Sequence, residues 1–379
     1  MHERYNEKAS LYLKTLLSQL CITCNNSIDD GWLGHFNRVS IKDSTKFVLP
    51  EEYAAMMPGF GGVSSKSATC IQYEYDLKTG SILDINITPA NRPDGRDAQE
   101  TQDKVMPKDL VIRDLGYYAT GVMAKFIEIG AFLISKLNTR TLVYQAMDNT
   151  YKQLEFDQLY HWMEKHNLQQ IEKQVYIGIK AKLPFRLIIT RVPDEVFAKR
   201  MQKINKYNKQ KGLTTSDDYA HRARFNLLIT NIPEETIPTE TIVAMYHLRW
   251  QIELIFKIWK STFGIHTIGK MKYNRWLCIL YAKLILIAIY WHTIMPLRSY
   301  LYQTKGKLLS IDKCFKTLKN VTYSLRDAIR KGSQAIEQFK GWMKELISEK
   351  HWLEKKRNKL NFEQIMYLRY CQSDIYVYI

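Results

Sequence analysis

The order in which strand-like and helix-like segments follow one another limits most strongly what this chain can fold into. The runs that predict strands are 39–43, 70–77, 82–88, 110–113 and 131–137. Helical patterns lie at 97–105 and 117–129, and Lys78-Thr79-Gly80-Ser81 predicts a hairpin turn between the second and third strands. This β-β-β-α-β-α-β order predicts an α/β fold in which helices pack on the faces of a mixed sheet.

The chain is long enough and apolar enough to bury one large core or several smaller ones. Its 379 residues are 46% hydrophobic, and 55 Lys and Arg oppose 38 Asp and Glu, for a net charge of +17. Such a charge predicts a polyanionic partner, either nucleic acid or an anionic membrane surface. A basic protein without such a partner is the alternative, because net charge bears on partners and not on fold.

One apolar run, 276–294, is nearly long enough to span a membrane. Lys283 lies in its middle, where lipid would make the charge costly, so we interpret the run as a buried core helix that stops at Pro296. The N-terminus lacks the apolar stretch of a secretory signal. Cys21 and Cys24 form a CxxC without a second pair at zinc-site spacing, which favours ordinary thiols in a reduced cytoplasm.

Beyond residue 138 the pattern changes to short strands. The strand-like runs there are 142–146, 174–179, 185–192 and 225–229, which predict a β-rich insertion. Within it, the segment 196–213 carries six basic residues and no acidic one. A basic loop or helix that meets a partner and a solvated charged helix explain this segment equally well.

The remainder of the chain reads as helical. A long helix is predicted from Thr239 to Phe263, where Gly264 ends it. The C-terminal segment 301–379 holds twice as many Lys and Arg as Asp and Glu, and it includes the cluster Lys355-Lys356-Arg357. We expect this region to form basic helices.

The segment YHLRWQIELIFKIWKS, which begins at Tyr246, has the most informative spacing. On a helix, four of its polar residues fall within an arc of roughly 60°: Tyr246, Arg249, Glu253 and Lys260. The neighbouring arc is apolar and would face the core, with Met245, Leu248, Ile252, Ile255, Phe256 and Trp259. Glu253 can ligate a hard divalent cation, whereas Arg249 and Lys260 can bind phosphate. The hydroxyl of Tyr246 can donate to a phosphate oxygen.

Spacing alone favours a plainer explanation of these four polar residues. Arg249 and Glu253 stand at i,i+4, which is a common stabilising ion pair on an exposed helix face. Packing also explains Trp250 and Trp259, which flank the motif. A lone carboxylate cannot support two-metal phosphoryl chemistry, so the functional interpretation needs further acidic residues.

Two aspartates at the ends of predicted strands are the companions that Glu253 requires. Asp43 closes the run RVSIKD, and Asp114 closes LVIRD. Ligands commonly collect at strand ends of a sheet. Taken singly, each aspartate is more often a turn residue or a helix N-cap.

With these residues together, the chain resembles the insertion-sequence-four family of DDE transposases, a branch of the RNase H-like superfamily, over roughly residues 31–330. The family signature is Tyr, two residues, Arg, three residues, Glu, six residues, Lys, which Tyr246 begins here with its spacing intact. Asp43 is followed by Ser44-Thr45, and Asp114 is followed by Leu115-Gly116-Tyr117, as in the family. This combined match is specific, and it outweighs the plain ion-pair interpretation.

The resemblance implies an RNase H-like mixed sheet flanked by helices, with a β-rich insertion domain and a helical C-terminal region. The implied segments are 1–30 (a short helical segment), 31–138 (first part of the core), 139–236 (the insertion), 237–300 (second part of the core) and 301–379 (basic helices). Asp43 lies close to the start of the chain, where full-length relatives place a longer helical domain that binds DNA ends. The chain is therefore expected to be a truncated copy or a short variant.

The resemblance also implies an activity, metal-dependent cleavage and strand transfer of insertion-sequence ends by a cut-and-paste mechanism. Asp43, Asp114 and Glu253 would be the catalytic carboxylates and would hold two Mg²⁺ ions, with Mn²⁺ as a substitute. Tyr246, Arg249 and Lys260 would contact DNA.

The implied partners are double-stranded DNA, as transposon ends and target, and a second copy of the chain in a homodimer on DNA. No membrane is expected, and the location would be the bacterial cytoplasm at the nucleoid. Two alternatives remain: an RNase H-like nuclease without strand transfer, and a truncated DNA-binding remnant that is inactive in transposition.

Overall fold

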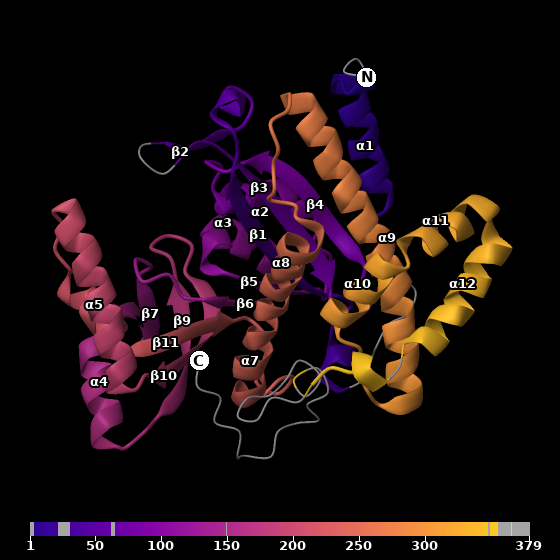
Figure 1. Ribbon diagram of the computed structural model, residues 1–379. Coiled ribbons are helices and arrows are strands. Elements are labelled where there is room, and N and C mark those ends of the chain that lie inside the picture. Colours follow the sequence, from indigo (N-terminus) through magenta and orange to yellow (C-terminus); the bar gives the residue numbers. More distant parts are fainter. Residues whose placement is uncertain are drawn as a thin grey trace. The chain divides into compact units, whose positions relative to one another are not determined.

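The computed structural model describes residues 4–21, 31–61, 65–148, 150–347, 349–354 and 365. These residues divide into two compact units (Figure 1). The first unit holds the described residues within Met1–Gly34, Arg38–Pro93 and Leu248–Arg369, and the second holds His35–Asn37 and those within Asp94–His247. Cys24, the turn predicted near residue 25 and the basic cluster at 355–357 lie outside the described residues.

The sheet of the first unit is an antiparallel meander. Its strands are β1 (Val39–Val48), β3 (Ser65–Asp76) and β4 (Ile82–Pro89), and the short strand β2 (Pro58–Gly61) pairs with β3. The three predicted strands are confirmed, but β1 continues beyond Asp43. The reason is that the ladder with β3 extends to Val48 opposite Ala68, although the apolar alternation in β1 ends earlier.

The predicted hairpin turn joins β3 to β4 and is stabilised by Asp76, by the conformation of Gly80 and by Trp291. Asp76 accepts hydrogen bonds from the backbone N–H groups of Lys78 and Thr79. Gly80 has a φ of 73°. This left-handed backbone conformation strains residues that carry a Cβ atom, whereas glycine adopts it readily. The indole N–H of Trp291 donates to the Gly80 carbonyl at 2.5 Å, which ties the turn to a helix.

Replacing Gly80 with Ala is expected to destabilise the protein by about 1–3 kcal/mol. A Cβ at this position would stand 2.7 Å from Met295 Cγ and would also force the left-handed backbone on alanine. The free energy of unfolding in urea measures the effect. Gly121→Ala is the control, since a Cβ there meets nothing within 4 Å and should be neutral or stabilising. If Gly80→Ala and Gly121→Ala changed the free energy of unfolding equally, the turn would not require glycine at position 80.

Two helices cover one face of the meander (Figure 1). These are α8 (Trp250–Phe263) and α9 (Tyr273–Lys305). The Tyr73 ring on β3 meets Trp259 of α8 at 4.8 Å and Trp291 of α9 at 6.2 Å, both edge-on. Since Asp43 pairs with Tyr73 across β1 and β3, its side chain belongs to the face that these helices cover.

Helix α9 departs from the prediction at its C-terminal end. The sequence predicts an end at Pro296, but the helix continues to Lys305, and Gly306 ends it in the left-handed conformation. Pro296 removes one backbone hydrogen bond, and the flanking Met295 and Leu297 stay buried, so packing holds the helix together. Lys283, in the middle of α9, donates to the Gly264 carbonyl at 2.6 Å.

By length and composition, α9 is the one helix among the described residues that could cross a membrane. Half of its most apolar window is buried inside the protein. Its neighbours in the first unit include α1 (Glu7–Gln19) and α10 (Ile311–Asn320). These contacts agree with the interpretation of α9 as a core helix. Helices α11 (Thr322–Lys331) and α12 (Ser333–Leu346) complete the predicted helical C-terminal region within the described residues.

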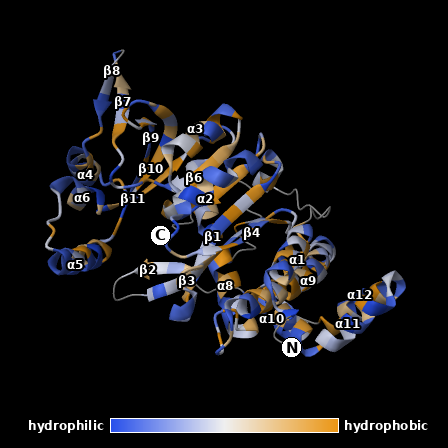
Figure 2. Ribbon diagram, turned by 90° about the horizontal axis from the view of Figure 1, so that it is seen from above, coloured by the Kyte–Doolittle hydropathy of each residue, from blue (hydrophilic) through white to orange (hydrophobic). Residues whose placement is uncertain are grey.

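The second unit is built on a mixed sheet. Strands β5 (Leu110–Arg113) and β6 (Phe132–Lys136) are parallel and are joined through helix α3 (Thr120–Glu128), as predicted. Antiparallel strands extend the sheet from β6: β11 (Phe225–Thr230), β10 (Leu183–Arg191), β9 (Gln170–Ile177), β7 (Val143–Met147) and β8 (Thr150–Gln153). Figure 2 shows hydrophobic residues along β6, β10 and β11.

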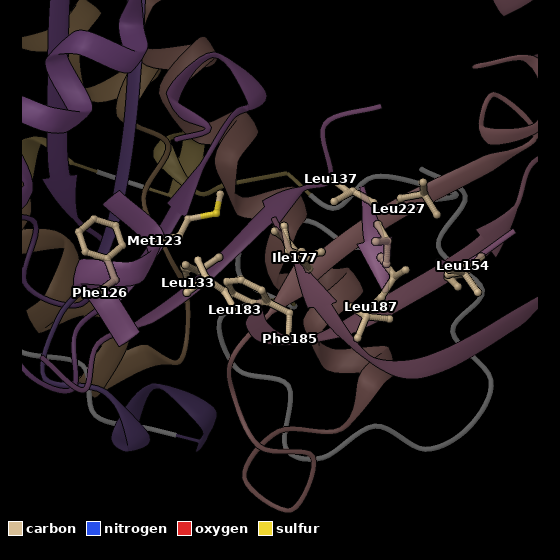
Figure 3. Packing of buried hydrophobic residues seen from close by; sticks show 14 of the residues in the cluster. Met123, Phe126, Leu133, Leu137, Leu154, Ile177, Leu183, Phe185, Leu187 and Leu227 are labelled. Atoms are coloured by element: carbon tan, nitrogen blue, oxygen red, sulfur yellow. The ribbon is translucent and has the colours of Figure 1, made fainter. Parts of the chain in front are cut away.

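The strands predicted as a separate insertion share one hydrophobic core with β6 and α3. Figure 3 shows Met123 and Phe126 of α3 in the same cluster as Phe185, Leu187 and Leu227 of the later strands. The second unit also contains β5, α3 and β6, since it includes the described residues from Asp94 to His247. The insertion at 139–236 stays a prediction. Both units confirm the mixed α/β class and are consistent with an RNase H-like fold.

The basic segment of the second unit is a helix, α5 (Asp194–Lys211). The long helix predicted from Thr239 to Phe263 is wrong as a single element. It is broken into α7 (Thr239–Tyr246), a 3₁₀ turn at His247–Arg249, and α8. The chain passes from the second unit to the first between residues 247 and 248, which gives the break its physical reason.

Candidate active site

Asp43 lies in the middle of β1, at the point where burial along the strand begins to fall. Its side chain is 19% exposed, and its Oδ1 accepts a hydrogen bond from the Ser44 N–H at 2.7 Å. The residues before it on β1 are buried, so the strand itself is anchored in the core. Asp43 is therefore a held but accessible carboxylate.

Glu253 stands in the first turn of α8, where the helix dipole favours a negative charge. Its side chain is 45% exposed. The predicted core arc of this segment is confirmed, because each of its members is at most 5% exposed: Met245, Leu248, Ile252, Ile255, Phe256 and Trp259. Burial of that arc turns Glu253 to the other side of the helix.

Arg249 connects the two carboxylates of the first unit. Its Nη1 atom lies 3.2 Å from Asp43 Oδ2 and 2.9 Å from Glu253 Oε1. Asp43 Oδ2 and Glu253 Oε1 therefore lie no farther apart than the sum of these two distances, although the two residues are far apart in the sequence. The structure thus brings Asp43 and Glu253 together, and the predicted i,i+4 ion pair is part of that arrangement.

An open groove of about 630 Å³ lies along these residues. Its walls come from β1, α8 and the loop that follows α8, and they comprise Asp43, Ser44, Thr45, Glu253, Phe256, Lys257, Lys260, Ser261 and His266. The carboxylates of Asp43 and Glu253 and the ammonium groups of Lys257 and Lys260 therefore line the same groove. Burial lowers the pKa of Lys260 from its ordinary value.

Sequence reasoning did not single out Lys257 or His266. Lys257 stands at i+4 from Glu253 and so emerges on the same side of the helix as the motif, which means that the helical spacing could have found it. Nothing in the sequence could have placed His266, because its position depends on the turn at Gly264. That glycine has a φ of 56°, and Ile265 beside it is 1% exposed, so the loop is anchored next to the groove.

The other predicted site residues lie in the second unit. Asp114 directly follows β5 and occupies the N-cap position of a 3₁₀ turn at Leu115–Tyr117, but its side chain makes no capping hydrogen bond. The Tyr246 hydroxyl donates to Asp114 Oδ1 at 3.5 Å. Tyr246 is 2% exposed, and Lys136 stands 5.8 Å above its ring. The structure thus pairs Tyr246 with a carboxylate inside the protein.

A buried charge cluster fixes the start of α7, the helix that carries Tyr246. Arg186 on β10 forms a two-pronged ion pair with Glu172 on β9, with N–O distances of 2.6 and 2.7 Å. Its Nη1 atom also donates to the carbonyls of Ile232 and Ile237 just before α7. Burial raises the pKa of Glu172, but hydrogen bonds from Arg186 and Thr239 outweigh it, and the pKa lies below its usual value.

The two tryptophans beside the motif behave differently. Trp259 is 1% exposed, so packing explains it as predicted. Trp250 is 59% exposed, and the packing explanation is wrong for it. The reason is the helical spacing, which puts residue 250 on the side of α8 opposite the buried Ile252, Ile255 and Trp259. Trp250 is available to a partner.

The donors in the first unit suit a hard divalent cation. Asp43 and Glu253 offer carboxylate oxygens, the ligands that Mg²⁺ prefers, and their oxygens already converge on one cationic nitrogen. Among the residues that the structure describes, no three His, Cys, Asp or Glu side chains form a ready-made metal cluster. The pair therefore fits part of a metal site, and the role of Asp114 as a third ligand stays a prediction.

Comparison with known proteins identifies the family. Residues 34–289 match the family model described as "Transposase DDE domain". The chain is 32% identical over 375 residues to the transposase for insertion sequence element IS231E of Bacillus thuringiensis subsp. finitimus, which covers 95% of this chain and 77% of that relative. It is 34% identical over 345 residues to the IS231F transposase of B. thuringiensis subsp. israelensis, with 87% and 72% covered. The IS1151 transposase of Clostridium perfringens is 29% identical over 353 residues, with 89% and 75% covered. The chain therefore belongs to the DDE transposase family.

Proposed function

We propose that this transposase cuts and rejoins DNA with Asp43, Asp114 and Glu253 as its catalytic carboxylates. As a DDE transposase, it catalyses DNA cleavage and strand transfer, depends on a divalent metal and binds DNA at insertion-sequence ends. The observation that supports the residue assignment is the approach of Asp43 and Glu253 to one Arg249 nitrogen. The fitting metal is Mg²⁺ as two ions, with Mn²⁺ as a substitute.

Each carboxylate is held in a different way. The Ser44 N–H orients Asp43, the first turn of α8 orients Glu253, and Tyr246 orients Asp114. When bound, the two ions would activate the attacking water or DNA 3′-OH and stabilise the leaving oxygen. The carboxylates then need no proton transfer of their own, and their task is to hold charge at fixed positions.

Arg249 and Lys260 are proposed as DNA contacts beside the cut. Lys260 lines the same groove as Asp43 and Glu253, where its ammonium can meet a phosphate of the strand. The resemblance predicts a DNA contact for Tyr246 as well. The burial of Tyr246 and its bond to Asp114 support a positioning role instead.

The direct test of the third carboxylate is Asp114→Asn. Cleavage of end DNA in Mg²⁺ should fall as far as it does in Asp43→Asn, because each change removes one ligand charge. Wild-type cleavage in Asp114→Asn would remove that residue from the site while leaving the other two in place. A strand-transfer assay with a labelled 3′-OH end separates transposition from cleavage alone, and cleavage without joining would favour the nuclease alternative.

The proposed assembly is a homodimer on two DNA ends in the cytoplasm, at the nucleoid, with a target duplex as the third partner. The C-terminal helices are the proposed dimer contact. Large apolar side chains are exposed there, including Tyr323 at 74%, Ile329 at 46% and Trp342 at 41%. Sedimentation of the protein on end DNA tests this, with two chains per complex as the expected result.

Helix α5 is proposed to contact DNA phosphates. Lys199, Lys203 and Lys206 are all exposed and recur at i, i+4 and i+7, which puts them on one side of the helix. If each neutralises one phosphate, replacing all three with Gln should reduce the slope of log binding constant against log salt by about 2.7. Titration of DNA binding at several salt concentrations measures this slope.

A matched control uses three exposed lysines that already pair with a glutamate. These are Lys66 with Glu51, Lys125 with Glu128 and Lys340 with Glu337. The triple Gln variant at these positions carries the same net charge as the α5 variant. Equal slopes in the two variants would show that α5 contributes only its bulk charge.

A further inference from the structure

Arg249 makes contacts that a simple phosphate-binding residue does not need. Its guanidinium lies within 3.2 Å of Asp43 and 2.9 Å of Glu253 through a single nitrogen atom. Its side chain is only 10% exposed, so solvent screens these contacts weakly. A cation that touches both carboxylates stands where a divalent ion ligated by the same oxygens would need to be.

We propose that Arg249 competes with the divalent metal for the two carboxylates of the first unit. In the metal-free protein its single positive charge offsets part of the negative charge of Asp43 and Glu253, and it leaves them when metal binds. Its guanidinium then becomes available to a DNA phosphate in the adjoining groove. This inference rests on the proposed function, because it takes Asp43 and Glu253 as metal ligands.

Electrostatics explains why such a device is useful. Two carboxylates that approach the same nitrogen atom repel each other, and a cation between them offsets that repulsion. Arg249 holds the two carboxylates close together, so the ligands are already arranged when metal arrives. The cost is a weaker apparent metal affinity, because the ion must displace a charge-assisted contact first.

The position of Arg249 also allows the second state. It precedes Glu253 by one turn at the N-terminal end of α8, and the groove with Lys257 and Lys260 runs along the same helix. Arginine has several rotatable bonds, so a change of rotamer can move its guanidinium from the carboxylates towards a bound strand without moving the helix. Metal binding and phosphate binding would thereby favour each other.

The experiment measures Mn²⁺ binding to the full chain without DNA, by calorimetry at fixed ionic strength. Arg249→Gln is expected to bind Mn²⁺ about tenfold more tightly than the wild type, even though it should cleave DNA poorly. Lys257→Gln removes an equal charge from the groove and should change the affinity by no more than about twofold. Arg249→Lys returns a charge and should stay near the wild-type affinity.

The outcomes separate this inference from the proposed function. Unchanged or weaker Mn²⁺ binding in Arg249→Gln, with wild-type far-ultraviolet circular dichroism, overturns the competition. Equal tightening in Lys257→Gln also overturns it, because general charge would then be the cause. Absence of saturable Mn²⁺ binding in every variant, and no difference in Glu253→Gln, would instead overturn the metal assignment of the carboxylates.

Discussion

Glu253→Gln is expected to reduce DNA cleavage by about 10³-fold or more while DNA binding stays close to that of the wild type. In the proposed site the metal ions would supply several kcal/mol of transition-state stabilisation, and the amide would remove one of their anionic ligands. Glutamine keeps the shape of the side chain, and Glu253 is 45% exposed, so the fold should tolerate the change. Cleavage of labelled end DNA in Mg²⁺ measures the rate, and gel shift in EDTA measures binding.

The control for this prediction is Glu240→Gln. Glu240 is an exposed acidic residue in the first turn of α7, just as Glu253 is an acidic residue in the first turn of α8. The control makes the same chemical change outside the groove, so it should cleave at the wild-type rate. If Glu253→Gln also cleaved at that rate, Glu253 would not be a metal ligand and its contact with Arg249 would be a plain helix ion pair.

The strands that carry the two aspartates could be predicted because their composition and alternation are local signals. The pattern places Asp43 on the first strand and Asp114 at the end of the fourth, and the structure has them on β1 and directly after β5. What brings Asp43 to Glu253 is not local. It depends on α8 packing on the Tyr73 face of the meander, which no pattern in either segment encodes.

The helix that carries the motif shows where periodicity is insufficient. Residues 239–263 keep a helical pattern throughout, yet the chain changes units within them and the turn at His247–Arg249 is 3₁₀. The motif is thereby split: Tyr246 pairs with Asp114, whereas Arg249 pairs with Asp43 and Glu253. The sequence pattern put these residues on one side of a single helix. In the folded protein they have different partners because the helix is broken between Tyr246 and Trp250.

The same limit applies to a charge that sequence reasoning passed over. Lys42 alternates with Ile41 and Asp43 on β1, which on a half-buried strand would leave one face polar and wet. Here both faces are covered, and the Lys42 side chain is 0% exposed. Its ammonium lies 2.9 Å from Asp84 Oδ2 and 3.6 Å from Glu74 Oε2, across the three strands of the meander.

Lys42→Met is expected to lower the free energy of unfolding by about 3–5 kcal/mol. Methionine fills much of the same space, but it leaves Glu74 and Asp84 facing each other with side chains only 6% and 11% exposed. The loss comes from removing the ammonium that contacts both carboxylates, so Lys42→Met combined with Glu74→Gln and Asp84→Asn should recover part of it. Urea unfolding measures all of these variants.

Lys66→Met supplies the matched comparison on the same sheet. Lys66 pairs with Glu51 at 3.0 Å, but the two side chains are 69% and 68% exposed, and such a pair is worth no more than about 1 kcal/mol. If Lys42→Met cost no more than Lys66→Met, the buried charges would not hold the meander together. Asp43 directly follows Lys42 on β1. In that case the buried charges around Lys42 also could not be what holds Asp43 beside α8.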